Sequence, residues 1–112
     1  MNGDVKQQEF DTVNNDEQIR LLDGLQGLLE KQIEMTRRGN LRRVEALAEQ
    51  ADAIVARIVQ TRVLQQPEFD GRREHLTKLY KKLELMLTAG KNAVSRQIRR
   101  IGNGRKTLQA YR

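Results

Sequence analysis

Apolar residues recur at helical spacing along most of the chain and divide it into three amphipathic segments. In the first segment, Ile19, Leu22, Leu29 and Ile33 fall at heptad spacing, with Gln26 in the same row, and further leucines widen the stripe. A face this broad contacts two neighbouring helices rather than one. The pattern predicts a helix over residues 16–38.

The clearest break in the pattern is the run Arg37-Arg38-Gly39-Asn40. Gly39 suits the left-handed position that ends a helix, and Asn40 can cap the next one. So short a link predicts an antiparallel hairpin, with a second helix over residues 41–65. Pro67 is expected to end that helix, because the residue before a proline disfavours helical dihedral angles.

The third apolar stripe is the longest, and it runs from Leu76 to Ile101. The pattern predicts a third helix over residues 68–101. From Asp70 to Ile101 it would be about 48 Å long, whereas each of the first two helices would span about 35 Å. The predicted fold is therefore all-α: an antiparallel helical hairpin plus a long third helix, in a three-helix, coiled-coil-like bundle with a protruding C-terminal amphipathic segment. Gly102 and Gly104 are expected to weaken the helix in that segment.

Polarity sets the remaining boundaries. Residues 1–15 are rich in Asn, Asp and Gln, and we expect a disordered N-terminal arm there, followed by a single helical domain over residues 16–112. Apolar residues make up 38% of the chain and aromatic residues only 4%, so the core must be aliphatic. The absence of cysteine, of an export signal and of any long apolar run predicts a cytoplasmic protein with no membrane span.

Charge is concentrated at one end of the chain. Residues 91–112 hold seven Lys/Arg and no Asp or Glu, whereas the residues before them hold 14 Lys/Arg and 15 Asp/Glu. The formal net charge of +6 is thus a property of the basic C-terminal segment. This segment is expected to meet a partner.

Residues suited to catalysis or metal binding are few. His75 is the only histidine, and the row Glu45, Glu49 and Asp52 is interpreted as a solvated charged face rather than a cation site. The run from Gly102 to Thr107 lacks the first glycine of a phosphate-binding loop. No nucleophile is paired with a base. The sequence predicts no catalytic, cofactor or metal site and hence no enzyme.

A basic amphipathic segment can bind a nucleic acid, a membrane surface or a partner helix. Its cations can neutralise phosphates of a nucleic acid, although only Tyr111 is available to stack on a base. A membrane-surface helix would need a larger apolar face. A modest apolar stripe among charged residues suffices to bind a partner helix, and the same stripe can also continue the core of a longer bundle. The partner-binding residues predicted here are Val94, Ile98, Ile101, Arg105, Lys106, Leu108 and Tyr111.

The chain is similar to flagellar export chaperones of the FlgN/FliT type over about residues 16–112. The similarity lies in the Leu-rich run 21–30, the Ala- and Arg-rich helix from Val44 to Arg62, the long third helix from Leu76, and the close Gly104-Arg105-Lys106-Thr107-Leu108-Gln109-Ala110-Tyr111. The resemblance implies a non-ATPase cytoplasmic chaperone of flagellar type III secretion and flagellum biogenesis. Such a chaperone holds a helical region of a hook–filament junction or cap protein, prevents its premature assembly and delivers it for export.

The resemblance also places client binding toward the C-terminal segment. On this hypothesis Ile98 and Leu108 are client-facing positions, whose replacement by Asp leaves the helicity of residues 1–90 nearly unchanged. A nucleic-acid-associated helical protein and a structural coiled-coil subunit are the alternatives, and a homodimer that buries the protruding segment is also open.

Overall fold

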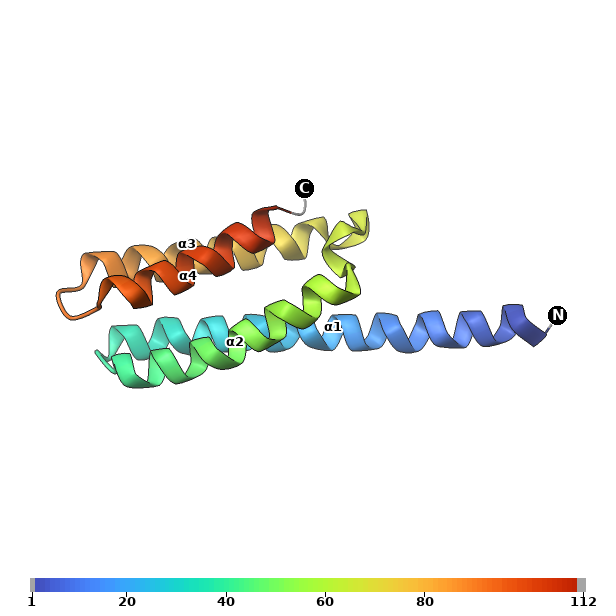
Figure 1. Ribbon diagram of the computed structural model, residues 1–112, viewed down its shortest axis with the longest axis horizontal. Coiled ribbons are helices and arrows are strands. Elements are labelled where there is room, and N and C mark those ends of the chain that lie inside the picture. The colour runs from blue at the N-terminus through green and yellow to red at the C-terminus, as the bar shows by residue number, and fades with distance from the viewer. Residues whose placement is uncertain (1, 111–112) are drawn as a thin grey trace.

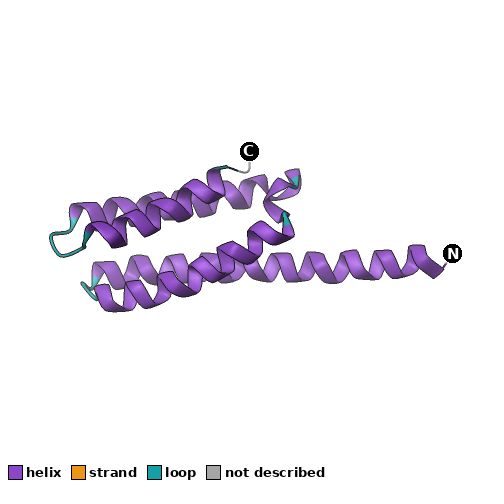
Figure 2. Cartoon of the chain, viewed as in Figure 1, coloured by secondary structure: helices purple, strands orange, loops and turns teal. Residues whose placement is uncertain are grey.

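The chain is helical throughout the part that the structure describes. The computed structural model describes residues 2–110, and their side chains from Asp16 onward. It contains the helices α1 (Asn2–Arg37), α2 (Leu41–Thr61), α3 (Asp70–Ala89) and α4 (Ser95–Gln109), with two short 3₁₀ turns between α2 and α3. Figure 2 shows helix almost everywhere and no strand among the described residues. The expected all-α class is confirmed.

The first hairpin forms as the sequence predicts. Gly39 adopts the left-handed conformation at φ 74°, where a side chain would be strained. Asn40 then caps α2, since its side chain accepts a hydrogen bond from the Arg43 backbone N–H at 3.1 Å. The two residues reverse the chain, so that α1 and α2 pack antiparallel (Figure 1).

The second helix ends earlier than predicted. Arg62, rather than a residue next to Pro67, takes a left-handed conformation at φ 57° and ends α2 at Thr61. The chain then makes the turns Val63–Gln65 and Pro67–Phe69. Gln66 is extended, as a residue before proline should be, and Pro67 begins the second turn. Buried apolar residues hold this link against the core, namely Val63, Leu64 and Phe69.

The prediction of one long third helix is wrong. Helix α3 stops at Ala89, where Gly90 takes an extended conformation with ψ 151°, and α4 begins only at Ser95. The chain reverses in between, so that α4 lies antiparallel along α3 (Figure 1). The C-terminal segment therefore does not protrude. It supplies the fourth helix of the structure.

The end that does extend past the other helices is the N-terminal one. Helix α1 begins at Asn2, whereas a disordered arm was expected over residues 1–15. With 36 residues it is the longest helix, and its first part runs beyond α2, α3 and α4 (Figure 1). A formed helix extends readily, because each added residue gains a hydrogen bond without a new nucleus, and only proline opposes this strongly. Residues 2–15 contain no proline.

The four helices form two antiparallel hairpins laid side by side. Helix α1 packs against α2 and α3, α3 packs against α4, and α4 meets α2 along the least closely packed of these four seams. One hydrophobic cluster joins all four helices and includes buried residues of each, such as Leu25, Ile58, Leu83 and Leu108. As expected, this core is almost entirely aliphatic.

The core row of α1 keeps the predicted Leu22, Leu29 and Ile33, and two glutamines that were not predicted are buried beside them. Gln18, Leu22, Leu25, Leu29 and Gln32 are all buried. The Gln18 amide donates a hydrogen bond to the Thr61 carbonyl at 3.3 Å. The Gln32 side chain is fully buried, and neither its nitrogen nor its oxygen has a hydrogen-bond partner among the described residues.

Two glycines let α4 approach α3 closely. A Cβ placed on Gly104 would lie 2.7 Å from the Tyr80 ring and 2.9 Å from its hydroxyl oxygen, and one placed on Gly102 would collide with the Glu84 carboxylate. Both glycines are buried within α4, which is continuous through them. Gly102 and Gly104 therefore do not break the helix. They provide the contact surface on which the ring of Tyr80 lies.

We expect opposite effects from alanine at two helical glycines. Gly104→Ala should lower the free energy of unfolding by about 1–3 kcal/mol, because the added methyl group overlaps the buried Tyr80 ring. Gly27→Ala should raise it by about 1 kcal/mol, because a Cβ at Gly27 meets nothing within 4 Å and alanine favours the helix. Urea unfolding followed by circular dichroism measures both. Equal effects at the two positions would contradict the close packing of α4 on α3.

Candidate protein-interaction site

The apolar residues predicted to bind a partner lie mostly inside the protein. Ile101 is 3% exposed and Leu108 is fully buried, and both belong to the shared hydrophobic cluster. Ile98 is half-buried and packs against that cluster. Val94, which precedes α4, is 52% exposed. The stripe thus completes the core of the bundle, and Leu108 is not the accessible position that the sequence hypothesis requires.

The predicted basic residues differ from each other in their surroundings. The Arg105 guanidinium contacts the Glu84 carboxylate at 3.3 Å and donates to the Gln109 side chain at 2.8 Å, and it is only 20% exposed. Lys106 is exposed in the last turn of α4. Tyr111 lies outside the described residues. Arg105 therefore joins α4 to α3, whereas Lys106 faces solvent.

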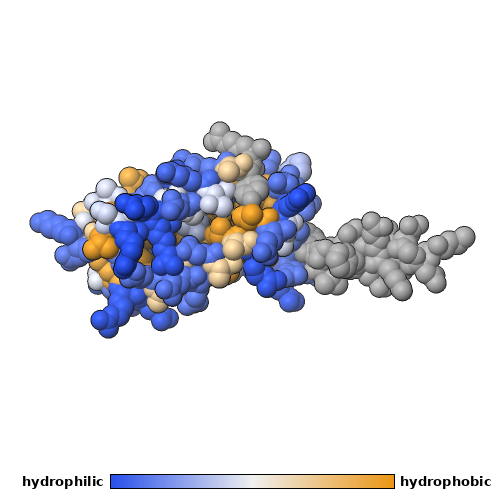
Figure 3. Space-filling view, in the orientation of Figure 1, coloured by the Kyte–Doolittle hydropathy of each residue, from blue (hydrophilic) through white to orange (hydrophobic). Residues whose placement is uncertain are grey.

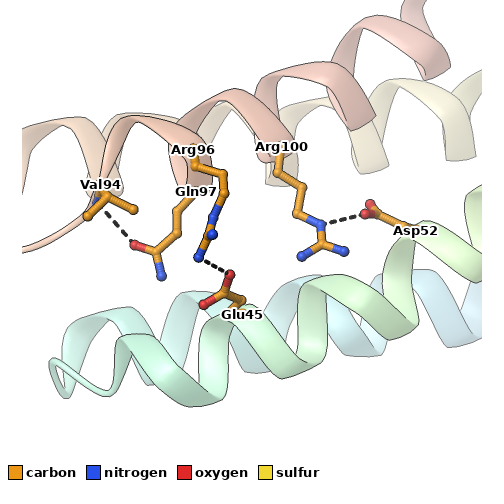
Figure 4. A network of polar contacts seen from close by, with 6 residues as sticks. All are labelled: Glu45, Asp52, Val94, Arg96, Gln97 and Arg100. Carbon is orange, nitrogen blue, oxygen red and sulfur yellow. Dashed lines mark hydrogen bonds and ion pairs between the residues drawn. The ribbon is translucent and has the colours of Figure 1, made fainter.

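Other cations of α4 reach the acidic row of α2. Arg96 pairs with Glu45 at 2.9 Å, and Arg100 pairs with Asp52 at 2.6 Å. Figure 4 shows both arginines extending from α4 across the seam to α2. The same view shows the Gln97 side chain, which accepts a hydrogen bond from the Val94 N–H at 3.1 Å and caps α4. Of the row that was interpreted as a solvated face, Glu45 and Asp52 thus contact α4 within the chain, whereas Glu49 is exposed as expected.

These ion pairs orient α4 more than they stabilise it. Arg96 is 78% exposed, so its pair with Glu45 is well screened by water and contributes little. The Arg100 and Asp52 side chains are 32% and 43% exposed, and such a pair contributes at most about 1 kcal/mol. The hydrogen bond to Asp52 raises the pKa of Arg100, and the charges of Asp52, Glu49 and Glu45 act in the same direction against partial burial. Arg100 is thus the main polar link across this seam.

Beyond Arg100 the seam between α2 and α4 opens into a groove. It has a volume of about 490 Å³ and is lined by Asp52, Val55, Ala56, Val59 and Gln60 of α2 and by Arg100, Asn103, Gly104 and Thr107 of α4. In Figure 3, apolar atoms gather at this place between the two helices. We call it the α2–α4 groove. Its valines give it an apolar floor, the Arg100–Asp52 ion pair lies at one end, and its other lining residues are small or carry uncharged polar side chains.

The ring of Tyr80 lies close behind the α2–α4 groove, against Gly104. Tyr80 is 1% exposed, and its hydroxyl has no hydrogen-bond partner among the described residues. Burial raises the pKa of the Tyr80 phenol above its ordinary value, and the negative charge of Asp52 raises it further. The neutral phenol is therefore the form that the folded chain accommodates.

Sequence reasoning missed the α2–α4 groove, because no residue in it is distinctive. The lining residues from α4 alternate with the predicted ones along the helix and lie on its adjacent face. The one available signal was the matched spacing of Glu45 and Asp52 on α2 with Arg96 and Arg100 on α4, which pairs two rows of opposite charge.

The described residues hold neither a metal-binding cluster nor a membrane-spanning helix. They contain no group of three or more metal-binding side chains. None of the helices combines the length and the apolar character needed to cross a membrane. Neither protein-family models, nor curated proteins, nor solved structures match the chain.

Reversing the charge of Arg100 should loosen α4. Arg100→Glu places a carboxylate beside Asp52 and is expected to lower the free energy of unfolding by about 1 kcal/mol and to speed amide hydrogen exchange in α4. Adding Asp52→Arg should restore most of the loss. Arg99→Glu is the matched control, since Arg99 is exposed and forms no ion pair among the described side chains. If the double variant is no more stable than Arg100→Glu, the pair does not link the helices.

Removing the Tyr80 hydroxyl should stabilise the protein, increasingly so in alkali. Tyr80→Phe eliminates a buried group without a partner and is expected to raise the free energy of unfolding by about 1 kcal/mol at neutral pH. The raised pKa means that the folded phenol stays neutral, while the unfolded one ionises above its ordinary pKa of 10.0. The parent chain should therefore lose up to about 1.4 kcal/mol more per pH unit than the variant above that pH. Urea titrations on both sides of that pH measure this, and parallel pH profiles would contradict it.

Proposed function

We propose that the chain is a non-enzymatic chaperone of the flagellar export type, which holds an amphipathic helical segment of a protein client in the α2–α4 groove. The observation that carries the proposal is this groove, an apolar channel left open beside the basic C-terminal helix. The resemblance to FlgN/FliT-type chaperones supports the choice of client, a hook–filament junction or cap protein. Binding that segment would keep it from assembling before delivery to the export apparatus in the cytoplasm.

The shape of the α2–α4 groove suits a helix. Its walls are two helices that run in the same direction, and a third helix can lie between them with its ridge of side chains in the channel (Figure 1). Ala56 and Gly104 are small, so a client backbone can approach closely. Val55 and Val59 would contact the apolar row of the client, at positions i, i+3, i+4 and i+7, while Gln60, Asn103 and Thr107 meet its polar flanks.

This proposal moves client binding to a neighbouring face of α4. Binding through Ile101 and Leu108 would require α4 to leave the bundle, because both side chains are in the core. The α2–α4 groove needs no such step. Lys106 stands one turn from Asn103 on the exposed side of α4, where it can attract an acidic client and set its register.

The nucleic-acid alternative is less well supported on this surface. Arg96, Arg100 and Arg105 are engaged by carboxylates of the chain itself. A phosphate backbone would have to displace those contacts, and the apolar floor of the α2–α4 groove would add nothing to its binding. A purely structural coiled-coil subunit remains the other alternative, for which the free chain should form a stable oligomer.

A pair of alanine positions tests the proposal. Ala56 lines the α2–α4 groove, whereas Ala46 is also exposed on α2 and lies outside it. Ala56→Arg should weaken binding of the client segment at least about tenfold by filling the channel, and Ala46→Arg should bind as the parent chain does. The measurement is calorimetric titration with peptides of the C-terminal helical regions of the hook–filament junction and cap proteins from the same organism.

Two outcomes would overturn the proposal. One is that none of these peptides binds the parent chain. The other is that the two arginine variants bind equally well, which would place the client elsewhere on the molecule. Circular dichroism of both variants guards against loss of the fold, and light scattering of the free chain tests the coiled-coil alternative.

A further inference from the structure

The outer face of α3 carries the most exposed large apolar side chain among the described residues. Leu85 is 70% exposed, although Leu83 and Leu87 beside it in the sequence are buried. Lys78, Lys81 and Lys82 precede it at helical spacing and are exposed as well. We call this row of three lysines and Leu85 the lysine face. It points away from α1 and α4, the helices on which α3 packs.

The cations of the lysine face lack the partners that other cations of the chain have. Arg72 pairs with Asp23 of α1 at 2.6 Å, and the arginines of α4 pair with carboxylates of α2 and α3. Lys78, Lys81 and Lys82 form no ion pair among the described side chains. Glu84, which follows them, contacts Arg105 instead. Glu74 precedes Lys78 by one turn without forming an ion pair with it, and the like charges of Lys78 and Lys82 at i and i+4 destabilise a helix slightly.

The lysine face is part of a wider asymmetry of charge. Residues 70–109, which form α3, α4 and the loop between them, contain eleven Lys/Arg and three Asp/Glu. Residues 2–61, which form the first hairpin and its link, contain eight Lys/Arg and eleven Asp/Glu. Acidic residues of the first hairpin thus neutralise part of the positive charge of the second hairpin. They do so only on the sides where the two hairpins meet. The outer side of α3 keeps its positive charge.

A shallow hollow adjoins the lysine face on the side of α4. It has a volume of about 490 Å³, and its lining consists of Glu74, Thr77, Lys78, Lys81 and Gln109 together with the Asp70–Arg73 ion pair. The hollow gives a bound segment somewhere to place a side chain beside the lysines. The surface is therefore shaped as well as charged.

From these observations we propose that the lysine face is a second docking surface, which binds an acidic amphipathic helix of a protein partner. Lys78 and Leu85 are seven residues apart, or about 10 Å along α3, which matches two turns of a facing helix. Glu or Asp side chains at i and i+3 or i+4 of the partner would meet the lysines, and an apolar residue one turn on would cover Leu85. Charge complementarity selects the partner and Leu85 fixes its register.

The composition of the lysine face favours a protein over the other polyanions. Its apolar centre would gain nothing from a phosphate backbone, and it has no exposed aromatic side chain on which a base could stack. A membrane-surface helix needs a continuous apolar face, whereas Leu85 is a single residue among lysines. An acidic amphipathic helix uses both the charge and the leucine.

This surface is independent of the proposed client site. Helix α2 lies diagonally across the bundle from α3, so the α2–α4 groove and the lysine face open on different sides. The chain can therefore hold one helix in the groove and a second, acidic one on α3 at the same time. It would act as an adaptor between two proteins, whatever occupies the groove.

Two synthetic helical peptides of about four turns and equal composition test the proposal. In the patterned peptide, glutamates at i, i+3 and i+4 share a face with leucine, and in the scrambled peptide they do not. The full-length chain, labelled with nitrogen-15, is titrated with each. We expect changes in the chemical shifts of backbone amides, centred on residues 78–88. We also expect the affinity for the patterned peptide to be at least about tenfold higher than that for the scrambled one. Leu85→Ser and Lys81→Gln should each weaken binding severalfold.

Matched variants separate this surface from the rest of the molecule. Val94→Ser and Lys31→Gln alter an exposed valine and an exposed lysine elsewhere, and Ala56→Arg blocks the α2–α4 groove. All three should bind the patterned peptide as the parent chain does. Equal affinity for the two peptides, or shifts centred on α2 and α4, would overturn the proposal. So would tighter binding of a DNA duplex or of phosphatidylglycerol vesicles that is lost in Lys81→Gln. None of these results depends on the client peptides binding the groove.

Discussion

The close approach of α4 to α3 is the constraint on which the rest of the structure depends. Without side chains at Gly102 and Gly104, α4 can lie against Glu84 and the ring of Tyr80. Only in that position are Ile101 and Leu108 buried in the common core, and only then do Arg96 and Arg100 reach the carboxylates of α2. A bulkier residue at either glycine would separate the two helices. The lining of the α2–α4 groove would change with them, because Gly104 itself forms part of its wall.

Charge distribution then determines which surfaces are used inside the molecule and which remain open. Glu45 and Asp52 of α2 pair with Arg96 and Arg100 of α4, so these four charges are engaged within the chain. The lysines of α3 face the one side that no acidic helix of the chain covers. Exposed ion pairs contribute little to stability, so apolar burial and close packing hold the bundle together while charge sets its register. The surfaces that this pairing leaves uncovered are therefore the ones best suited to bind a second protein.

Local signals in the sequence predicted the turn between α1 and α2 well. Gly39 and Asn40 are a strong combination for a helix end and a cap, and both behave as their chemistry requires. The second half of the fold was not predictable in the same way. An apolar stripe from Leu76 to Ile101 reads as one helix, and a single glycine at position 90 does not reveal that the chain reverses there. Likewise, Gly104 looks like a helix breaker until the ring of Tyr80 is seen against it, a contact between residues far apart in the sequence.

The candidate site, too, depends on contacts between helices that the sequence pattern alone does not reveal. A stripe of apolar residues on a basic helix has the same pattern whether it covers a core or binds a partner, and in this chain it covers the core. What is left for partners is determined by geometry that no single helix encodes. The α2–α4 groove exists because two helices separate beyond Arg100, and the lysine face is open because α2 lies diagonally opposite α3. Although the apolar stripes of this short chain are buried in a single core, the chain can therefore still present two separate surfaces to other proteins.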